Sequence, residues 1–350
     1  MIRFLAKRIR YSLFILWGVV TLVFFMFNVL PADPARLVMG QRSDLASIEN
    51  ARRDLNLDKP MWLRYCLYLN DLSPIGLHEN DSATQTKYHY QKLIPLSSRC
   101  IAAKWPYLGR SYRTKKEVSA VLSEALPGTI ILALAAMTFA TIIGILLGTL
   151  AALKKDTWLD TSSIVASVAG ISMPSFFAAL LIAYFFGFLL HSITGLNMTG
   201  SLWEYDAFKG KRLMLRNLIL PALALGIRPL AIITQLTRSA MLDVLSQDYI
   251  RTANAKGLTK TRVIFRHALP NALNPVITAV SGWLAELLAG SFFVEYIFGW
   301  KGVGKITVDA LDKFDFPLVM GAVLLTAFIF IIVNLLTDIL YSKIDPRVRL

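Results

Sequence analysis

The sequence predicts an all-α polytopic membrane protein with six transmembrane helices. Of its 350 residues, 55% are hydrophobic and only 17% are charged, and the mean hydropathy is +0.53. The average segment therefore prefers hydrocarbon to water, which argues against a soluble globular domain and against a disordered chain. Two cysteines are too few for a disulfide scaffold.

Six hydrophobic segments reach the length of about 20 helical residues that a bilayer requires. The fourth is the least clear, because it contains Arg228, Arg238 and two prolines. Pro174 lies in the middle of the third, where we expect it to kink the helix. The predicted spans are Tyr11–Ala32, Ala125–Leu153, Thr161–Leu190, Asn217–Leu242, Asn271–Phe298 and Phe316–Tyr341.

The basic residues predict the orientation of these spans. The termini and loops on one side carry 14 Lys and Arg residues, whereas the short loops on the other side carry 7. Positive loops stay in the cytosol, so we expect both termini to be cytosolic. The net charge of +14 is then a topology signal, and it indicates no nucleic-acid partner. The apolar run Leu13–Leu30 is too long for a secretory signal and predicts an uncleaved anchor.

The spans divide the chain into four parts. Residues 1–32 form a cytosolic N-terminus and the first span, 125–341 the transmembrane core, and 342–350 a cytosolic tail. Between them, 33–124 forms an extracytoplasmic segment. Its part 73–104 has no clear periodicity, so we interpret it as irregular or inserted.

The extracytoplasmic segment contains few residues that could form a disulfide or bind a metal. Arg52–Leu72 predicts an amphipathic helix. Cys66 and Cys100 are either free thiols or a disulfide, and the sequence leaves both readings open. His78 and His89 have no further His or Cys near them at ligand spacing, so we interpret them as solvated loop residues rather than as a metal site.

Two features inside the spans are informative. Small residues recur every fourth position along the second span and allow close helix packing, either static or mobile: Ala136, Ala140, Gly144, Gly148 and Ala152. Arg228 and Glu286 lie at similar depth in the fourth and fifth spans, where a charge is costly. We hypothesise that they form an ion pair; two independent polar groups lining water are the alternative.

We find no catalytic constellation and expect no cofactor. Gly299–Lys305 fits the start of a phosphate-binding P-loop, but Ile306 follows where Ser or Thr is required. No predicted strand precedes this segment, and the expected topology places it outside the cytosol. We therefore reject a nucleotide site and expect no enzymatic activity in the chain.

The most informative segment is the predicted cytosolic loop 243–270. Asp248–Lys256 favours a helix, Gly257 suits a left-handed helix end, and Lys260–Ala268 favours a second short helix. These elements predict a helix–turn–helix on the cytosolic face. By itself, such a loop is also compatible with a solvated basic segment or a contact with anionic lipid.

At this loop, the sequence resembles the permease subunits of ABC importers, and specifically the dipeptide/oligopeptide/nickel permease family. The loop follows the form D-Y-I-R-T-A-x-A-K-G-L and R-H-A-L-x-N-A, although Arg251, Thr252 and His267 depart from the general importer signature. Lys301 stands where the family usually has Pro. Further matching segments are Leu30–Pro34, Ser172–Phe176, Trp300–Gly304, Asn334–Leu335 and Asp345–Arg349.

This resemblance implies a non-catalytic pore subunit of the type I importer fold in the inner membrane of a bacterium. Implied partners are a homologous second permease, two cytosolic ATPases, an extracytoplasmic solute-binding protein and membrane lipid. Di- or oligopeptides are the expected cargo, with nickel or another small solute as the alternative. A secondary transporter that works without ATPases is the competing class, and a membrane enzyme is disfavoured.

The resemblance also implies which residues couple the pore to the ATPases. The loop between the fourth and fifth spans would act as a coupling helix that docks on an ATPase. The residues implied are Asp248, Tyr249, Arg251, Thr252, Ala253, Ala255, Lys256, Gly257, His267, Leu269 and Pro270.

Overall fold

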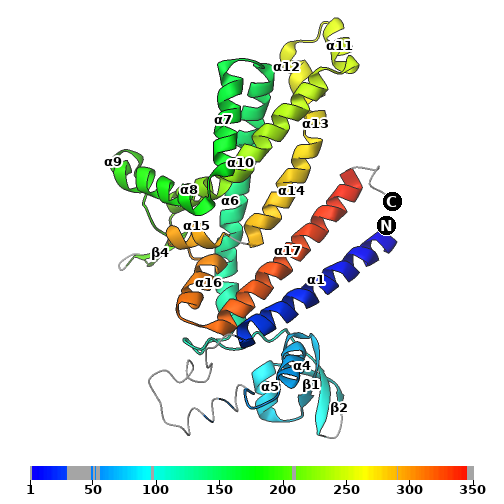
Figure 1. The fold of residues 1–350 in the computed structure, drawn as a ribbon, viewed down its shortest axis with the longest axis vertical. Helices are drawn as coiled ribbons and strands as arrows, with labels where there is room; N and C mark the ends of the chain where they lie inside the picture. Colours follow the sequence, from blue (N-terminus) through cyan, green and yellow to red (C-terminus); the bar gives the residue numbers. More distant parts are fainter. Residues whose placement is uncertain are drawn as a thin grey trace. The chain divides into compact units, whose positions relative to one another are not determined.

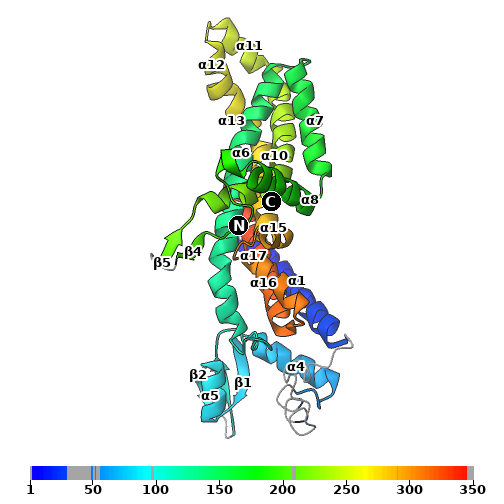
Figure 2. The ribbon, with the colours of Figure 1, turned by 90° about the vertical axis from the view of Figure 1, so that its left-hand side faces the viewer.

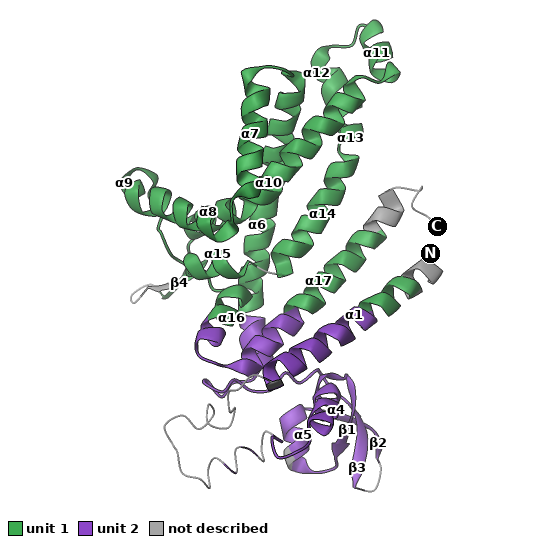
Figure 3. Cartoon of the chain, in the orientation of Figure 1, with its two compact units in different colours: residues 1–12, 125–308, 326–350 green, residues 13–124, 309–325 purple. Residues whose placement is uncertain are grey.

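The computed structural model describes residues 2–29, 49, 52, 56–95, 98–206, 210–289 and 291–344. The chain divides into two compact units (Figure 3). Unit 1 comprises residues 1–12, 125–308 and 326–350, and unit 2 comprises residues 13–124 and 309–325. The family-like segments Leu30–Pro34 and Asp345–Arg349 lie outside the described residues.

Helices make up most of the described chain (Figure 1). The long helices are α1 (Ile2–Val29), α6 (Val118–Leu153), α7 (Trp158–Ser172), α10 (Arg216–Leu245), α14 (Asn274–Ala289) and α17 (Phe316–Ile344). Short helices fill the connections: α8 (Ser175–Ile182), η1 (Ala183–Leu189), α9 (His191–Thr194), α11 (Asp248–Ala255), α12 (Lys260–Val263), η2 (Ile264–Ala268), α13 (Leu269–Ala272), α15 (Phe292–Ile297) and α16 (Val303–Asp312). A hairpin of β4 (Trp203–Asp206) and β5 (Gly210–Leu213) projects from the helices of unit 1 (Figure 2).

Four described helices are long and apolar enough to cross a membrane, and two bent helix pairs raise this number to six if each pair is one span. The first pair breaks at Met173 and Pro174, with an angle of 109° between its halves. We predicted a kink here; the structure has a complete break. Proline disfavours helical backbone in the residue before it, and both residues adopt extended ψ angles.

The other pair of helices also differs from the predicted span Asn271–Phe298. The pair comprises Lys260–Ala272 and Asn274–Ala289, with an angle of 53° between them. Glu295 therefore lies beyond this span, in the separate helix α15.

Helix α10, which was the least clear span in the sequence, is the most enclosed of the four single-helix candidates. Of its most hydrophobic window, 61% is buried inside the structure, compared with 33% for α6. It accommodates Pro221 and Pro229 within the helix. Neighbouring helices rather than lipid surround much of α10, which explains why its sequence can be less hydrophobic than that of the other spans.

The small residues of the second span lie on the face of α6 that packs against α10. Ala136 and Ala140 are fully buried. A Cβ atom on Gly144 would lie 2.8 Å from Ile233 Cγ2, and one on Gly148 would lie 2.5 Å from the Thr234 carbonyl oxygen. The absence of side chains at these glycines is what allows the two helices to approach so closely.

We expect Gly148→Ala to lower the thermal stability of the purified protein and Gly282→Ala to leave it nearly unchanged. The added methyl group at position 148 meets backbone at 2.5 Å, so the helices must separate, whereas a Cβ at Gly282 has nothing within 4 Å in the part of the chain that the structure describes. Melting temperatures of the two variants in one detergent measure the difference. Equal melting temperatures would contradict this packing.

Unit 2 contains a small α/β subdomain in the region that we interpreted as irregular or inserted. Strands β1 (Ile75–Glu79), β2 (Gln91–Pro95) and β3 (Arg99–Ala103) form an antiparallel sheet in the order β1-β3-β2. Helix α5 (Ser82–Tyr88) connects the first two strands, and α4 (Met61–Leu72) precedes them. The prediction of irregular structure was wrong because each strand has only five residues, too few to establish a clear period.

The histidines and cysteines of this subdomain form neither a metal site nor a disulfide among the described residues. His78 is buried rather than solvated as we predicted, with its ring 4.5 Å from Tyr88 and 5.5 Å from Tyr90 between centroids. Burial lowers the pKa of His78 and favours its neutral form. His89 is exposed. Cys66 and Cys100 are both free thiols, and the described residues contain no group of three or more potential metal ligands.

Candidate functional site: the loop between α10 and α14

The structure contains the predicted helix–turn–helix at one end of unit 1 (Figure 1). Helix α11 starts with an acidic residue, Asp248, in its first turn, which suits the positive end of a helix dipole. After the turn, α12, η2 and α13 continue as one helical segment from Lys260 to Ala272. That segment is longer than the predicted Lys260–Ala268 helix.

Gly257 ends helix α11 as the sequence predicted. Its φ angle is +75°, in the left-handed region that favours glycine. The Gly257 amide donates to the Asn254 carbonyl at 2.9 Å, and the Leu258 amide donates to the Ala253 carbonyl at 3.4 Å. These two bonds form a Schellman motif, which reverses the chain direction directly after the helix.

Apolar residues hold the helix–turn–helix against the ends of α6 and α10. Ile250 and Ala253 form the buried face of α11. Burial of one isoleucine side chain stabilises a folded protein by roughly 1.5–3 kcal/mol. We call this cluster the loop core: Ala152, Met241, Ile250, Ala253, Val263, Ala268 and Ala272. Ala152 is the last member of the α6 stripe, so the packing of α6 on α10 continues directly into the loop.

The opposite face of α11 is exposed and polar. The side chain of Arg251 is 77% exposed, and that of Asp248 is 95% exposed. Tyr249 is partly exposed, and its hydroxyl accepts a hydrogen bond of 3.1 Å from Asn271, which connects α11 to α13. Further exposed members of the predicted set are Thr252, Ala255, Lys256 and Pro270, whereas His267 and Leu269 are half-buried. The predicted residues therefore divide between an outer face and the loop core.

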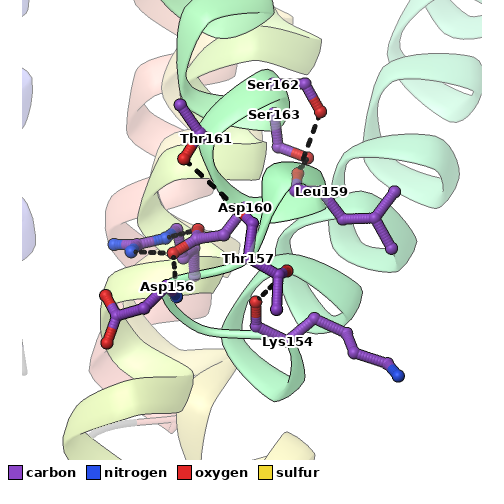
Figure 4. Close-up of polar contacts among 9 residues, drawn as sticks. Lys154, Asp156, Thr157, Leu159, Asp160, Thr161, Ser162 and Ser163 are labelled. Atoms are coloured by element: carbon purple, nitrogen blue, oxygen red, sulfur yellow. Dashed lines mark hydrogen bonds and ion pairs between the residues drawn. The ribbon is translucent and has the colours of Figure 1, made fainter.

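A salt bridge that we did not predict lies where α6 passes into α7 (Figure 4). The Arg238 guanidinium on α10 donates from both Nε and Nη2 to the Asp160 carboxylate on α7, the second bond at 2.7 Å. The Asp156 amide also donates to Asp160, at 3.1 Å. This forked geometry fixes the α6–α7 turn to α10, close to the loop core.

We expect a double-mutant cycle of Asp160→Asn and Arg238→Gln to be strongly non-additive in thermal stability. Each single variant leaves one charged partner without its counter-ion, whereas the double variant leaves neither. Melting temperatures of the four proteins measure this coupling. Additive losses would mean that the pair is not a unit.

The predicted ion pair between Arg228 and Glu286 is absent from the described contacts. The Arg228 guanidinium lies 5.9 Å from the centre of the Trp283 ring instead, in the range of a cation–π contact. Glu286 is exposed on α14. Similar depth in the membrane did not bring the two side chains together, because depth does not determine which way a residue faces around its helix.

A second buried polar group lies at Glu295, which is fully buried. Its Oε1 accepts hydrogen bonds from Thr129 of α6 at 2.8 Å and from Ser291 at 2.5 Å. Its Oε2 accepts from the Lys305 amide in the first turn of α16, at 3.1 Å. A Cβ on Gly302 would lie 2.3 Å from this carboxylate. The carboxylate thus joins α6, α15 and the positive end of α16.

This arrangement explains the glycine-rich segment that resembled a P-loop. Gly128 approaches so closely that a Cβ on it would lie 2.0 Å from the Lys301 carbonyl. The Trp300 indole donates to the Gly128 carbonyl at 2.9 Å, and the Val303 amide donates to Thr129 at 2.9 Å. The segment thus binds the protein's own carboxylate and hydroxyl groups with the amides that a P-loop would offer to phosphate.

Comparison with known families identifies the chain. Residues 144–350 match the model of the family "Binding-protein-dependent transport system inner membrane component", and residues 1–133 match the model of its N-terminal region. The chain belongs to this family. The permease is accordingly a multi-pass protein of the inner membrane and a component of a transport system.

Curated relatives match the permease over its full length. It is 35% identical to the di/tripeptide transport system permease protein DppB of Pseudomonas aeruginosa, covering 100% of this chain and 99% of that protein. It is 33% identical to the dipeptide transport system permease protein DppB of Alkalihalophilus pseudofirmus, covering 100% of both. Among solved structures, it is similar to a chain of the inward-facing MetNI methionine ABC transporter, with a TM-score of 0.48, 15% identity, and coverage of 65% of this chain and 97% of that one.

Proposed function

We propose that this permease is the non-catalytic, pore-forming subunit of an ATP-driven importer, with six spans and cytosolic termini. The observation that carries the proposal is the loop between α10 and α14. Its inner face packs on the ends of α6 and α10, and its outer face presents an exposed helix with a charged surface. A helix held on one face and free on the other suits the transmission of a partner's movement.

In this mechanism, energy enters the permease through contact rather than through chemistry. ATPase subunits bind the outer face of α11 and move when they bind and hydrolyse ATP. Ile250 and Ala253 pass that movement to Met241 on α10 and Ala152 on α6. The Asp160–Arg238 salt bridge carries the turn before α7 along with α10. The spans thereby switch the pore between inward-open and outward-open states.

Cargo and partners follow from the relatives. Names of the curated relatives refer to dipeptide and di/tripeptide transport, so we propose di- or oligopeptides as cargo; nickel or another small solute is the alternative. A homologous second permease, two cytosolic ATPases and an extracytoplasmic solute-binding protein complete the importer. Residues 33–124 form its extracytoplasmic segment and 243–270 its coupling loop, within a core of 125–341.

Reconstituted uptake tests this function. The permease is purified with its associated subunits, placed in liposomes and supplied with radiolabelled dialanine and the solute-binding protein. We expect uptake that requires ATP on the side of the termini and that persists when ion gradients are collapsed. Uptake driven by a proton or sodium gradient without ATP would instead establish a secondary transporter.

A further inference from the structure

A pocket in unit 2 lies outside the coupling loop and the predicted sites. It encloses about 720 Å³ of space, part of it open to solvent. One wall is apolar and includes Phe24 and Phe27 of α1 and Phe316 of α17. The other is polar and includes Arg64 and Tyr68 of α4.

The apolar wall is at the boundary of the membrane. Candidate spans run over Lys7–Asn28 and Phe316–Ile339, so Phe27 lies at the end of one span and Phe316 at the start of another. Their rings are 5.5 Å apart between centroids. The pocket therefore opens where hydrocarbon gives way to the headgroup region, a level at which aromatic side chains concentrate.

The polar wall carries a cation without an anionic partner among the described residues. Arg64 donates to the side-chain oxygen of Asn28, which is neutral, and no described carboxylate lies within 4.0 Å of its guanidinium. Burial lowers the pKa of Arg64, which reflects the partial loss of water around its charge. A guanidinium held in this way favours an anionic ligand with two oxygens in one plane.

Two tyrosines add hydrogen-bond donors to the same pocket. The Tyr68 hydroxyl is buried and has no hydrogen-bond partner among the described residues, a costly state unless a ligand supplies one. Burial raises the pKa of Tyr68, and it raises that of Tyr112 to about 12. Both hydroxyls therefore keep their protons near neutral pH and can donate to an anion.

We propose that this pocket binds a membrane phospholipid, with the phosphodiester at Arg64 and Tyr68 and the acyl chains along Phe27 and Phe316. A basic residue beside the ends of two spans lies at the level of the lipid headgroups, where its charge can pair with a phosphate. Asp71 also lines the pocket, but its carboxyl group accepts a hydrogen bond from Tyr88 and lies close to Lys104 and Lys87. Asp71 is therefore already engaged within unit 2, and the phosphodiester alone defines the headgroup that the pocket recognises.

Lipid retention tests the proposal without reference to transport. The full-length permease, purified with its associated subunits, is delipidated and titrated with phosphatidylethanolamine, and bound lipid is counted by native mass spectrometry. We expect Arg64→Gln to raise the lipid concentration for half-occupancy at least tenfold and Tyr68→Phe to raise it severalfold. Arg64→Lys should retain part of the affinity, which separates loss of charge from loss of folding.

Arg99→Gln is the matched control, because Arg99 is exposed on β3 and does not line the pocket; it should bind as the parent protein does. Equal lipid binding by Arg64→Gln and Arg99→Gln would overturn the proposal. Displacement of the lipid by inorganic phosphate at millimolar concentration would identify a simple anion site instead. Displacement by dialanine would identify a peptide site, and either displacement would also overturn the lipid assignment.

Discussion

Glu295→Leu should prevent the permease from accumulating in a folded form. The leucine leaves three donors without the acceptor they have now: the hydroxyls of Thr129 and Ser291 and the amide of Lys305. Each buried donor left unpaired costs about 1–3 kcal/mol, so the loss is roughly 3–9 kcal/mol. Typical domains have only about 5–15 kcal/mol of net stability. Fluorescence-detected size-exclusion chromatography of solubilised membranes measures the folded fraction.

Glu286→Leu is the control for this experiment. It removes the same charge from an exposed position on α14, so we expect nearly normal amounts of folded protein. Glu295→Gln should give an intermediate result, because an amide keeps the shape and one acceptor but loses the charge next to α16. If Glu295→Leu and Glu286→Leu accumulated equally, the carboxylate would not join the three helices.

Gly257→Val should abolish ATP-dependent uptake while leaving membrane insertion intact. The residue has φ of +75°, and a β-branched side chain is strained there by more than the roughly 1–2 kcal/mol that other L-residues lose. Relief of that strain requires the turn after α11 to open, which tilts the helix away from the loop core. Uptake into liposomes and the amount of purified complex are measured together.

Gly257→Asn separates backbone conformation from contact with a partner. Asparagine tolerates the left-handed region, and a Cβ at this position has no described atom of the chain within 4 Å. If Gly257 acts only through the turn, the asparagine variant transports at close to the parent rate. Loss of uptake in both variants would mean that a partner packs directly against position 257. Normal uptake by Gly257→Val would contradict a role for the turn.

Local sequence signals predicted the helix–turn–helix well. Gly257 marks the end of α11, because a C-cap depends only on neighbouring backbone groups, and Asp248 lies in the first turn, where a negative charge suits the helix dipole. The small-residue stripe on α6 could also be predicted from the sequence, since it requires only a period of four residues. The helix that packs against this stripe could not be predicted, because any other span could have supplied the opposite face.

Interactions between distant residues could not be predicted from one sequence. Arg238 pairs with Asp160, 78 positions away, whereas Arg228 faces the Trp283 ring. Both arginines lie in the same predicted span, and rotation about the helix axis decides their partners. The sequence did contain a signal for Glu295: an acidic residue shortly before a run of glycines, where only a missing Cβ leaves room for a buried carboxylate.

Site-specific photo-crosslinking shows directly whether the exposed face of α11 contacts an ATPase subunit. A benzoylphenylalanine is placed at Arg251 on the exposed face of α11, and in a second protein at Lys92 on exposed strand β2. Irradiated cells are analysed by mass spectrometry of the crosslinked bands. We expect position 251 to capture a subunit with a P-loop ATPase sequence and position 92 not to capture it. Capture of the ATPase from position 92, or from neither position in cells with active uptake, would contradict this expectation.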